Sequence, residues 1–127
     1  MGQANEMRIL IVEDEFIIAD EIASIVEGLG HSIVGPTGTL EEAGSIIADQ
    51  ELDFAIIDAN LRGRSSAELG QRLAERAVPY CVCTGYRLDD IRAAFGDVPV
   101  VQKPVRERAL ASILQSAAEN STLSSKC

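Results

Sequence analysis

The sequence has few cysteines, no long apolar run and no excess of positive charge, and each of these absences excludes a class of protein. Its three cysteines are an odd number, two within one apolar run and one at the last position, which argues against a disulfide framework and a zinc site. No apolar run approaches the ~20 residues that cross a bilayer, and no basic stretch followed by an apolar one stands at the N-terminus. The formal net charge of −9 disfavours contact with nucleic-acid phosphates. We therefore expect a protein of the reducing cytoplasm, with proteins or cations as partners and neither nucleic acid nor membrane among them.

The chain of 127 residues, 46% hydrophobic and 24% charged, has the composition of an ordinary globular protein. Short apolar runs of strand composition alternate with segments in which apolar residues recur at helical spacing. The runs predict strands at residues 8–12, 32–35, 54–58, 80–83 and 99–102. The periodic segments, two of which begin with a capping box, predict helices at residues 16–29, 39–51, 65–78, 89–95 and 106–119.

This regular alternation favours a doubly wound α/β domain, because parallel neighbouring strands need crossover connections and helices supply them. The sheet should therefore be five-stranded and parallel, with helices on both faces. We expect one domain over residues 1–127, with a core at about 7–119 and a frayed tail at about 120–127.

Four of the five predicted strands end in polar side chains of complementary chemistry. Glu13 and Asp14 follow the first strand, Asp58 ends the third, Thr84 the fourth and Lys103 the fifth. The carboxyl ends of the strands meet at one edge of an open α/β sheet, where ligands bind. Considered singly, each residue has an ordinary explanation, such as a turn or an acidic group at a helix N-terminus. Their joint placement is what predicts a functional site.

The chemistry of that edge suits a divalent cation and phosphoryl transfer. Carboxylates brought close together repel one another, and a hard cation relieves the repulsion. Mg²⁺ prefers oxygen ligands and is commonly held by one or two carboxylates and a phosphate, which fits Glu13, Asp14 and Asp58. A carboxylate can also attack phosphorus and form an acyl phosphate if cations neutralise the transferring oxygens. Lys103 is a candidate for that counter-charge, and Thr84 for a hydroxyl donor.

The order of these residues, over nearly the whole chain, resembles that in the receiver domains of two-component response regulators. The likeness rests on the acidic pair, the aspartate at the end of the third strand, a threonine before Gly85, a lysine before Pro104, and the run Asn60-Leu61-Arg62-Gly63. It implies the flavodoxin-like (βα)5 fold with strand order 2-1-3-4-5.

The resemblance also implies roles for individual residues. Asp58 would take a phosphoryl group from a histidine kinase or a histidine phosphotransfer protein, and Thr84 and Lys103 would contact the phosphoryl oxygens. Asp14 and Asp58 would bind Mg²⁺ directly, with Glu13 acting through water. The backbone carbonyl of Asn60 would complete the metal site, and the peptide between Lys103 and Pro104 would be cis.

The sequence departs from the family pattern at two positions. Arg62 stands where proline is common, and Val100 stands three residues before the lysine, where an aromatic switch residue is usual. Tyr86, two residues after Thr84, is the nearest ring and the candidate for a replacement switch. The run at residues 79–86 resembles a subgroup of stand-alone receivers with proline, an aromatic residue and Thr-Gly-Tyr around the fourth strand.

The sequence fits other functions less well than phosphoacceptor signalling. A haloacid-dehalogenase-like phosphatase also forms an aspartyl phosphate with Mg²⁺, but it needs Asp-x-Asp-x-Thr after its first strand, where this chain has Val-Glu-Asp-Glu-Phe at residues 12–16. A receiver that only binds partners unphosphorylated would be expected to lack the acceptor or the lysine, and both are present. A role as a phosphoryl shuttle or sink stays open.

The predicted output is a binding event, because only about eight residues follow the last predicted helix. We expect a phosphorylation-dependent change in the face formed by the fourth helix, fifth strand and fifth helix, read by a downstream protein. Beyond self-phosphorylation and autodephosphorylation, no enzymatic activity is expected.

Overall fold

A five-stranded parallel sheet lies at the centre of the computed structural model, which describes residues 6–126 and the side chains of residues 6–120. The strands are β1 (Arg8–Val12), β2 (Ser32–Thr37), β3 (Phe54–Asp58), β6 (Tyr80–Thr84) and β7 (Val100–Gln102). They pair in the order β2-β1-β3-β6-β7. Counted along the chain within this sheet, that is the order 2-1-3-4-5, so the predicted flavodoxin-like α/β fold is confirmed.

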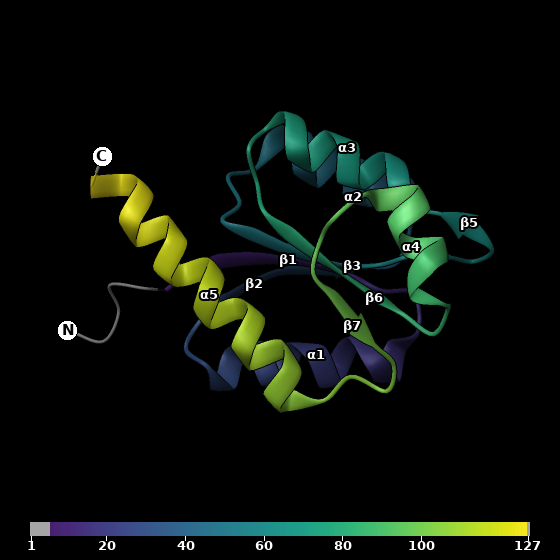
Figure 1. Ribbon diagram of the computed structural model, residues 1–127, viewed down its shortest axis with the longest axis horizontal. Helices are drawn as coiled ribbons and strands as arrows, with labels where there is room; N and C mark the ends of the chain where they lie inside the picture. The colour runs from purple at the N-terminus through teal and green to yellow at the C-terminus, as the bar shows by residue number, and fades with distance from the viewer. Residues whose placement is uncertain (1–5, 127) are drawn as a thin grey trace.

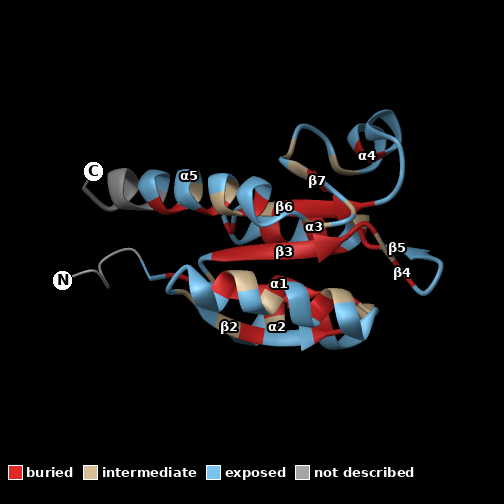
Figure 2. Cartoon of the chain, turned by 90° about the horizontal axis from the view of Figure 1, so that it is seen from below, coloured by how far each residue is buried: buried red, intermediate tan, exposed pale blue. Residues whose placement is uncertain are grey.

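Helices cover both faces of the sheet (Figure 1). They are α1 (Phe16–Gly28), α2 (Leu40–Asp49), α3 (Ala67–Glu75), α4 (Leu88–Phe95) and α5 (Glu107–Lys126). Helices α1 and α5 lie on one face, and α2, α3 and α4 on the other. Alternate residues of a strand point to opposite faces, so β3 contributes Phe54 and Ile56 to the core beneath α1 and α5, and Ala55 and Ile57 to the other core. Because β3 is buried along its whole length (Figure 2), its sequence is a continuous apolar run.

The two predicted capping boxes have different outcomes. At α2, the Thr39 hydroxyl accepts a hydrogen bond from the N–H of Glu42 at 3.1 Å, which is the first half of a capping box, while the Glu42 carboxylate accepts from the Thr37 hydroxyl instead of closing the box. At α3 the prediction was wrong. The residue that precedes the helix is Ser66 rather than Ser65, and the Ser66 side chain makes no cap hydrogen bond. Its hydroxyl is directed back toward β3 instead.

A β-hairpin that the sequence pattern did not reveal connects β3 to α3. Strand β4 (Asn60–Leu61) pairs antiparallel with β5 (Arg64–Ser65). The two turn residues, Arg62 and Gly63, have φ angles of 52° and 82°. Two consecutive positive φ angles are characteristic of a type I′ turn, whose twist matches that of the paired strands. The hairpin projects from the carboxyl edge of the sheet (Figure 2).

The C-terminal helix is longer than the sequence predicted. Helix α5 continues to Lys126, past its predicted end near Glu119 and into the stretch predicted to fray, while residue 127 lies outside the described residues. The peptide between Lys103 and Pro104 is cis, as the resemblance implied, and so is the peptide between Gly35 and Pro36. Within residues 6–126, none of the helices combines the length and apolar character needed to cross a membrane.

Candidate functional site

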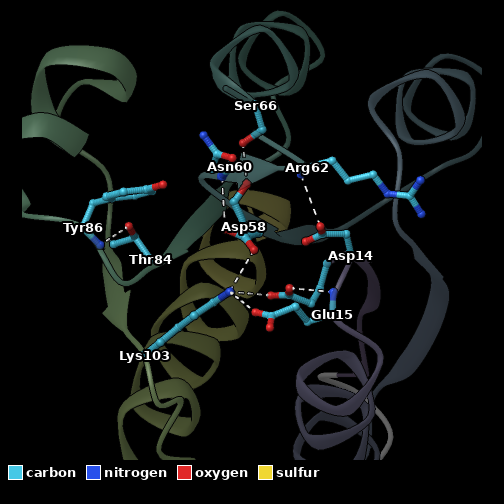
Figure 3. Close-up of polar contacts among 10 residues, drawn as sticks. Asp14, Glu15, Asp58, Asn60, Arg62, Ser66, Thr84, Tyr86 and Lys103 are labelled. Carbon is cyan, nitrogen blue, oxygen red and sulfur yellow. Dashed lines mark hydrogen bonds and ion pairs between the residues drawn. The ribbon is translucent and has the colours of Figure 1, made fainter. Parts of the chain in front are cut away.

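The polar strand ends meet at the carboxyl edge of the sheet (Figure 3). Asp58 is the last residue of β3 and is buried, Glu13 and Asp14 directly follow β1, Thr84 ends β6, and Lys103 follows β7. Strands β1 and β6 flank β3. The acidic pair therefore stands on one side of the β3 aspartate and the threonine on the other. The fold thus brings together the residues that were far apart in the sequence.

Glu13, Asp14 and Asp58 form a compact acidic cluster. Each offers a carboxylate oxygen, and these oxygens lie within 4.8 Å of one another. Glu13 is buried, with Oε2 accepting the N–H of Glu15 at 3.0 Å, while Oε1 has no hydrogen-bond partner assigned among the described residues and forms an ion pair with Nζ of Lys103 at 3.0 Å. A buried carboxylate oxygen with spare capacity beside two further carboxylates suits a hard divalent cation. The residues present therefore fit the predicted metal site.

Lys103 is the cation that faces this cluster. Its Nζ donates to Oδ2 of Asp58 at 2.8 Å and lies 3.0 Å from Oε1 of Glu13 and 3.8 Å from Oε1 of Glu15. Burial alone lowers the pKa of Lys103, but its hydrogen bonds and the charges of its two near partners outweigh burial and raise that pKa. Burial raises the pKa of Glu13 to about 7, despite the opposing effects of the Glu15 N–H and the Lys103 ammonium. Lys103 thus stays protonated, and its single positive charge does not neutralise all the carboxylates around it.

The β4–β5 hairpin supplies backbone donors to two of the carboxylates. The N–H of Asn60 donates to Oδ1 of Asp58 at 3.1 Å, and the N–H of Arg62 donates to Oδ2 of Asp14 at 3.2 Å. Proline at position 62 would lack this N–H and could not adopt the positive φ angle of the turn. That gives a physical reason for the absence of proline there. The Arg62 side chain itself points away from the site (Figure 3).

The three residues considered for the switch lie in different surroundings. Thr84 is buried, and its Oγ1 accepts a hydrogen bond from the N–H of Tyr86 at 2.8 Å. Tyr86 is 56% exposed and lines the same open pocket as Asp58. Val100 pairs with Val82 in the sheet and packs against the core beneath α2 and α3. The exposed ring next to the site is therefore Tyr86, while Val100 belongs to the packing of the domain.

Two side chains at the site were not predicted from the sequence. Glu15 lies within reach of Lys103, and its place in the acidic run after β1 was a signal that could have revealed it. Ser66 is fully buried, and its hydroxyl donates to the backbone carbonyl of Asp58 at 2.5 Å. A serine before a helix normally predicts a cap, so local sequence did not indicate this contact.

The fold and the site together define a flavodoxin-like α/β domain with buried acidic groups and a lysine at the carboxyl edge of its sheet. The family described as the response regulator receiver domain matches residues 9–115, and the chain belongs to it.

Several characterised proteins are similar to this chain. The phyllosphere-induced regulator PhyR of Methylorubrum extorquens is 30% identical over 116 residues, covering 86% of this chain and 42% of PhyR. The solution structure of SdrG from Sphingomonas melonis Fr1 has 36% identity and a TM-score of 0.78, covering 90% of this chain and 97% of SdrG. A mutant of the anti-anti-sigma factor PhyR from Bartonella quintana has 27% identity and a TM-score of 0.72, covering 89% of this chain and 48% of that one. The chain spans less than half the length of the curated relatives that it matches.

Proposed function

We propose that this protein accepts a phosphoryl group on Asp58 from a histidine kinase or a histidine phosphotransfer protein and signals by binding another protein. The observation that carries the proposal is the 2.8 Å contact between Nζ of Lys103 and Oδ2 of Asp58, within a cluster of three carboxylates. A lysine held at the acceptor carboxylate can neutralise charge on an incoming phosphoryl group, where catalysis rests on positioning and electrostatics. Membership in the receiver family supports the same function.

The proposed transfer follows from these positions. One carboxylate oxygen of Asp58 bonds to phosphorus as the phosphorus–nitrogen bond of the donor phosphohistidine breaks, and the electron pair of that bond remains on the imidazole nitrogen. The Lys103 ammonium pairs with a phosphoryl oxygen, and the Thr84 hydroxyl, whose oxygen already accepts the Tyr86 N–H, donates a hydrogen bond to another phosphoryl oxygen. Attack of water on phosphorus then returns the free carboxylate and releases inorganic phosphate. We propose no activity on a separate substrate.

Glu13, Asp14 and Asp58 are the residues that would hold a magnesium ion, with the Asn60 carbonyl as a further ligand. The positive charge that such an ion supplies reduces repulsion between the acceptor carboxylate and the phosphoryl oxygens. Without it, Lys103 is the one cation within ion-pair distance of Asp58 and Glu13 among the described residues.

For the output, we propose that Tyr86 replaces the aromatic switch that Val100 cannot provide. Its backbone is bonded to Thr84, and its side chain lines the pocket. A change at the Thr84 hydroxyl would therefore reach an exposed ring beside α4. The likeness to PhyR, named an anti-anti-sigma factor, supports a downstream protein partner. Substituting Tyr86→Ala should change the affinity of the phosphorylated protein for that partner, and an unaltered affinity would count against this switch.

The phosphoacceptor assignment is tested with acetyl phosphate and Mg²⁺, followed by intact-mass measurement. We expect the mass gain of one phosphoryl group, which a chelator of divalent cations prevents. Asp58→Asn should abolish it, whereas Asp53→Asn is the matched control, because Asp53 precedes β3 at the opposite end of the same strand and bonds the N–H of Arg8. A mass gain that survives Asp58→Asn contradicts the assignment.

A role as phosphoryl shuttle or sink is the alternative within the same chemistry. It is favoured if the phosphorylated protein passes its group rapidly to a histidine phosphotransfer protein. Phosphotransfer profiling against purified histidine kinases, with the lifetime of the acyl phosphate measured in parallel, distinguishes a sink from a signalling form that persists and binds a partner.

A further inference from the structure

Ser66 is a buried polar side chain next to the acceptor that the proposed chemistry does not use. Its exposed fraction is 0%, and its Oγ lies 2.5 Å from the backbone carbonyl oxygen of Asp58, to which it donates. The residue directly precedes α3, where a serine commonly caps the helix, yet its side chain makes no cap bond. The neighbouring Ser65 hydroxyl instead accepts the N–H of Ala67 at 3.1 Å. The Ser66 hydroxyl is thus committed to the acceptor strand.

The topology of the sheet explains why the Asp58 carbonyl needs such a donor. Successive residues of a strand direct their backbone groups to alternate neighbours. The N–H of Ala59 donates to the carbonyl of Cys83 in β6 at 2.9 Å, so the Asp58 carbonyl is directed to the β1 side. Strand β1 ends at Val12, which pairs with Ile57, so no residue of β1 stands opposite Asp58. The Ser66 hydroxyl supplies the donor that the sheet no longer provides.

A second bond makes this contact a clamp on the end of β3. The N–H of Ser66 donates to the carbonyl of Ala59 at 3.0 Å, next to the bond from its hydroxyl to Asp58. The backbone of the acceptor is therefore held by β6 on one side and by Ser66 on the other. Of these bonds, the one from the hydroxyl is the one that a side-chain substitution removes.

We propose that Ser66 is a positioning residue for the phosphoacceptor. By holding the carbonyl of Asp58, it fixes the backbone from which the carboxylate projects, and so the direction of that carboxylate toward Lys103 and the acidic cluster. Without the hydroxyl, the buried carbonyl loses its partner, and the peptide turns to find another. Phosphoryl transfer tolerates only displacements well below 1 Å between the reacting atoms, so even a small rotation of the Asp58 peptide should slow it. This inference rests on the proposed phosphoacceptor function.

The test compares variants that separate the hydroxyl from its volume. Ser66→Ala removes the hydroxyl, while Ser66→Thr and Ser66→Val have nearly equal size and differ in whether a hydroxyl is present. The maximal rate constant for phosphorylation by acetyl phosphate with Mg²⁺ should fall about tenfold in Ser66→Ala and Ser66→Val. The concentration of acetyl phosphate that gives half the maximal rate should stay unchanged. The maximal rate constant of Ser66→Thr should stay within about twofold of that of the parent. Ser65→Ala, which removes an exposed hydroxyl one residue away, is the matched control and should match the parent.

A second readout does not depend on phosphorylation. Residues that orient the ligands of a metal typically change its affinity about 10- to 100-fold when substituted. Calorimetric titration with Mg²⁺ should therefore show an affinity about tenfold lower for Ser66→Ala and Ser66→Val, with Ser66→Thr and Ser65→Ala close to the parent. If altered packing alone were responsible, Ser66→Thr and Ser66→Val would lose Mg²⁺ affinity equally. Thermal unfolding of each variant measures the effect of packing on stability.

The outcomes distinguish this inference from the function on which it rests. If the parent gains a phosphoryl group but Ser66→Ala and Ser66→Val match it in rate and Mg²⁺ affinity, the positioning role is wrong and the phosphoacceptor function stands. Ser66→Thr as impaired as Ser66→Val also overturns the positioning role. If the parent gains no phosphoryl group while Mg²⁺ binding follows the predicted pattern, the function is wrong and the positioning of the Asp58 carboxylate stands.

Discussion

Replacing Lys103 with methionine is the perturbation that most sharply exposes the electrostatics of the site. Methionine keeps much of the length of the side chain but removes the ammonium that lies 2.8 Å from Asp58 and 3.0 Å from Glu13. The side chains of Asp58 and Glu13 are 8% and 1% exposed, so water screens them poorly, while that of Lys103 is 18% exposed. Breaking a buried ion pair typically costs about 3–5 kcal/mol, and the partial exposure of Lys103 places this case near the lower end. We expect a loss of about 3 kcal/mol in the free energy of unfolding at pH 8, or about 10 °C in Tm.

The loss should depend on pH with a definite sign. The pKa of Glu13 is about 7 in the folded protein, above its ordinary value of 4.5, so folding favours the protonated carboxyl between these values. The stability from this proton is fully present below pH 4.5 and is lost as pH rises toward 7. Removing Lys103 removes an interaction that lowers the pKa of Glu13. The deficit of Lys103→Met relative to the parent should therefore be larger at pH 8 than at pH 6.

Mg²⁺ should rescue this variant more than it stabilises the parent, because the ammonium and the metal compete for the same carboxylate oxygens. Thermal unfolding at pH 8 with and without Mg²⁺ measures the effect, since a ligand at a hundred times its Kd adds about 2.7 kcal/mol. Arg106→Met is the matched control, because Arg106 is an exposed cation in the segment between β7 and α5. The reasoning is refuted if Mg²⁺ raises the Tm of Lys103→Met no more than that of the parent.

Three further predictions concern the hairpin beside the site and two contacts elsewhere in the fold. Arg62→Pro should lose about 3 kcal/mol in chemical denaturation, since it removes a bonded N–H at a φ of 52°, whereas Arg62→Asn should equal or exceed the parent. Gly70→Ala places a methyl group 2.6 Å from the Tyr80 hydroxyl and should cost about 1–3 kcal/mol, less in a Tyr80→Phe background; equal losses in both backgrounds would exclude this clash. Burial lowers the pKa of His31, whose Nδ1 accepts the N–H of Met7. The stability that neutral His31 contributes is therefore present above pH 6.5 and lost on acidification, so His31→Gln should flatten the profile of Tm against pH between pH 7 and 5.

The sheet could be predicted because its strands are short apolar runs that end in polar residues. The run before Asp58 is buried on both faces, and such a strand leaves a clear signature in composition. The convergence of Glu13, Asp14, Thr84 and Lys103 followed from topology alone, because parallel strands bring their carboxyl ends to one edge. That reasoning needed no knowledge of distances.

What the sequence did not reveal depends on tertiary contacts. The hairpin turn Arg62-Gly63 lacks the Asn-Gly or Asp-Gly pair that usually signals a type I′ turn. The role of Ser66 is invisible locally, because the donor is needed only where β1 stops one residue short of Asp58. The extension of α5 past Glu119 runs through residues of weak helical periodicity, where composition favoured a frayed end.

Locating the phosphoryl group chemically is the most direct test of the central claim. After reaction with acetyl phosphate and Mg²⁺, borohydride reduction converts an acyl phosphate on aspartate to homoserine, which fragmentation of the peptide spanning residues 9–62 assigns to a position. The account predicts homoserine at position 58 and an unmodified Asp14 in the same peptide. Homoserine at another aspartate, or a phosphoryl group that resists reduction because it sits on a hydroxyl or on His31, would contradict it.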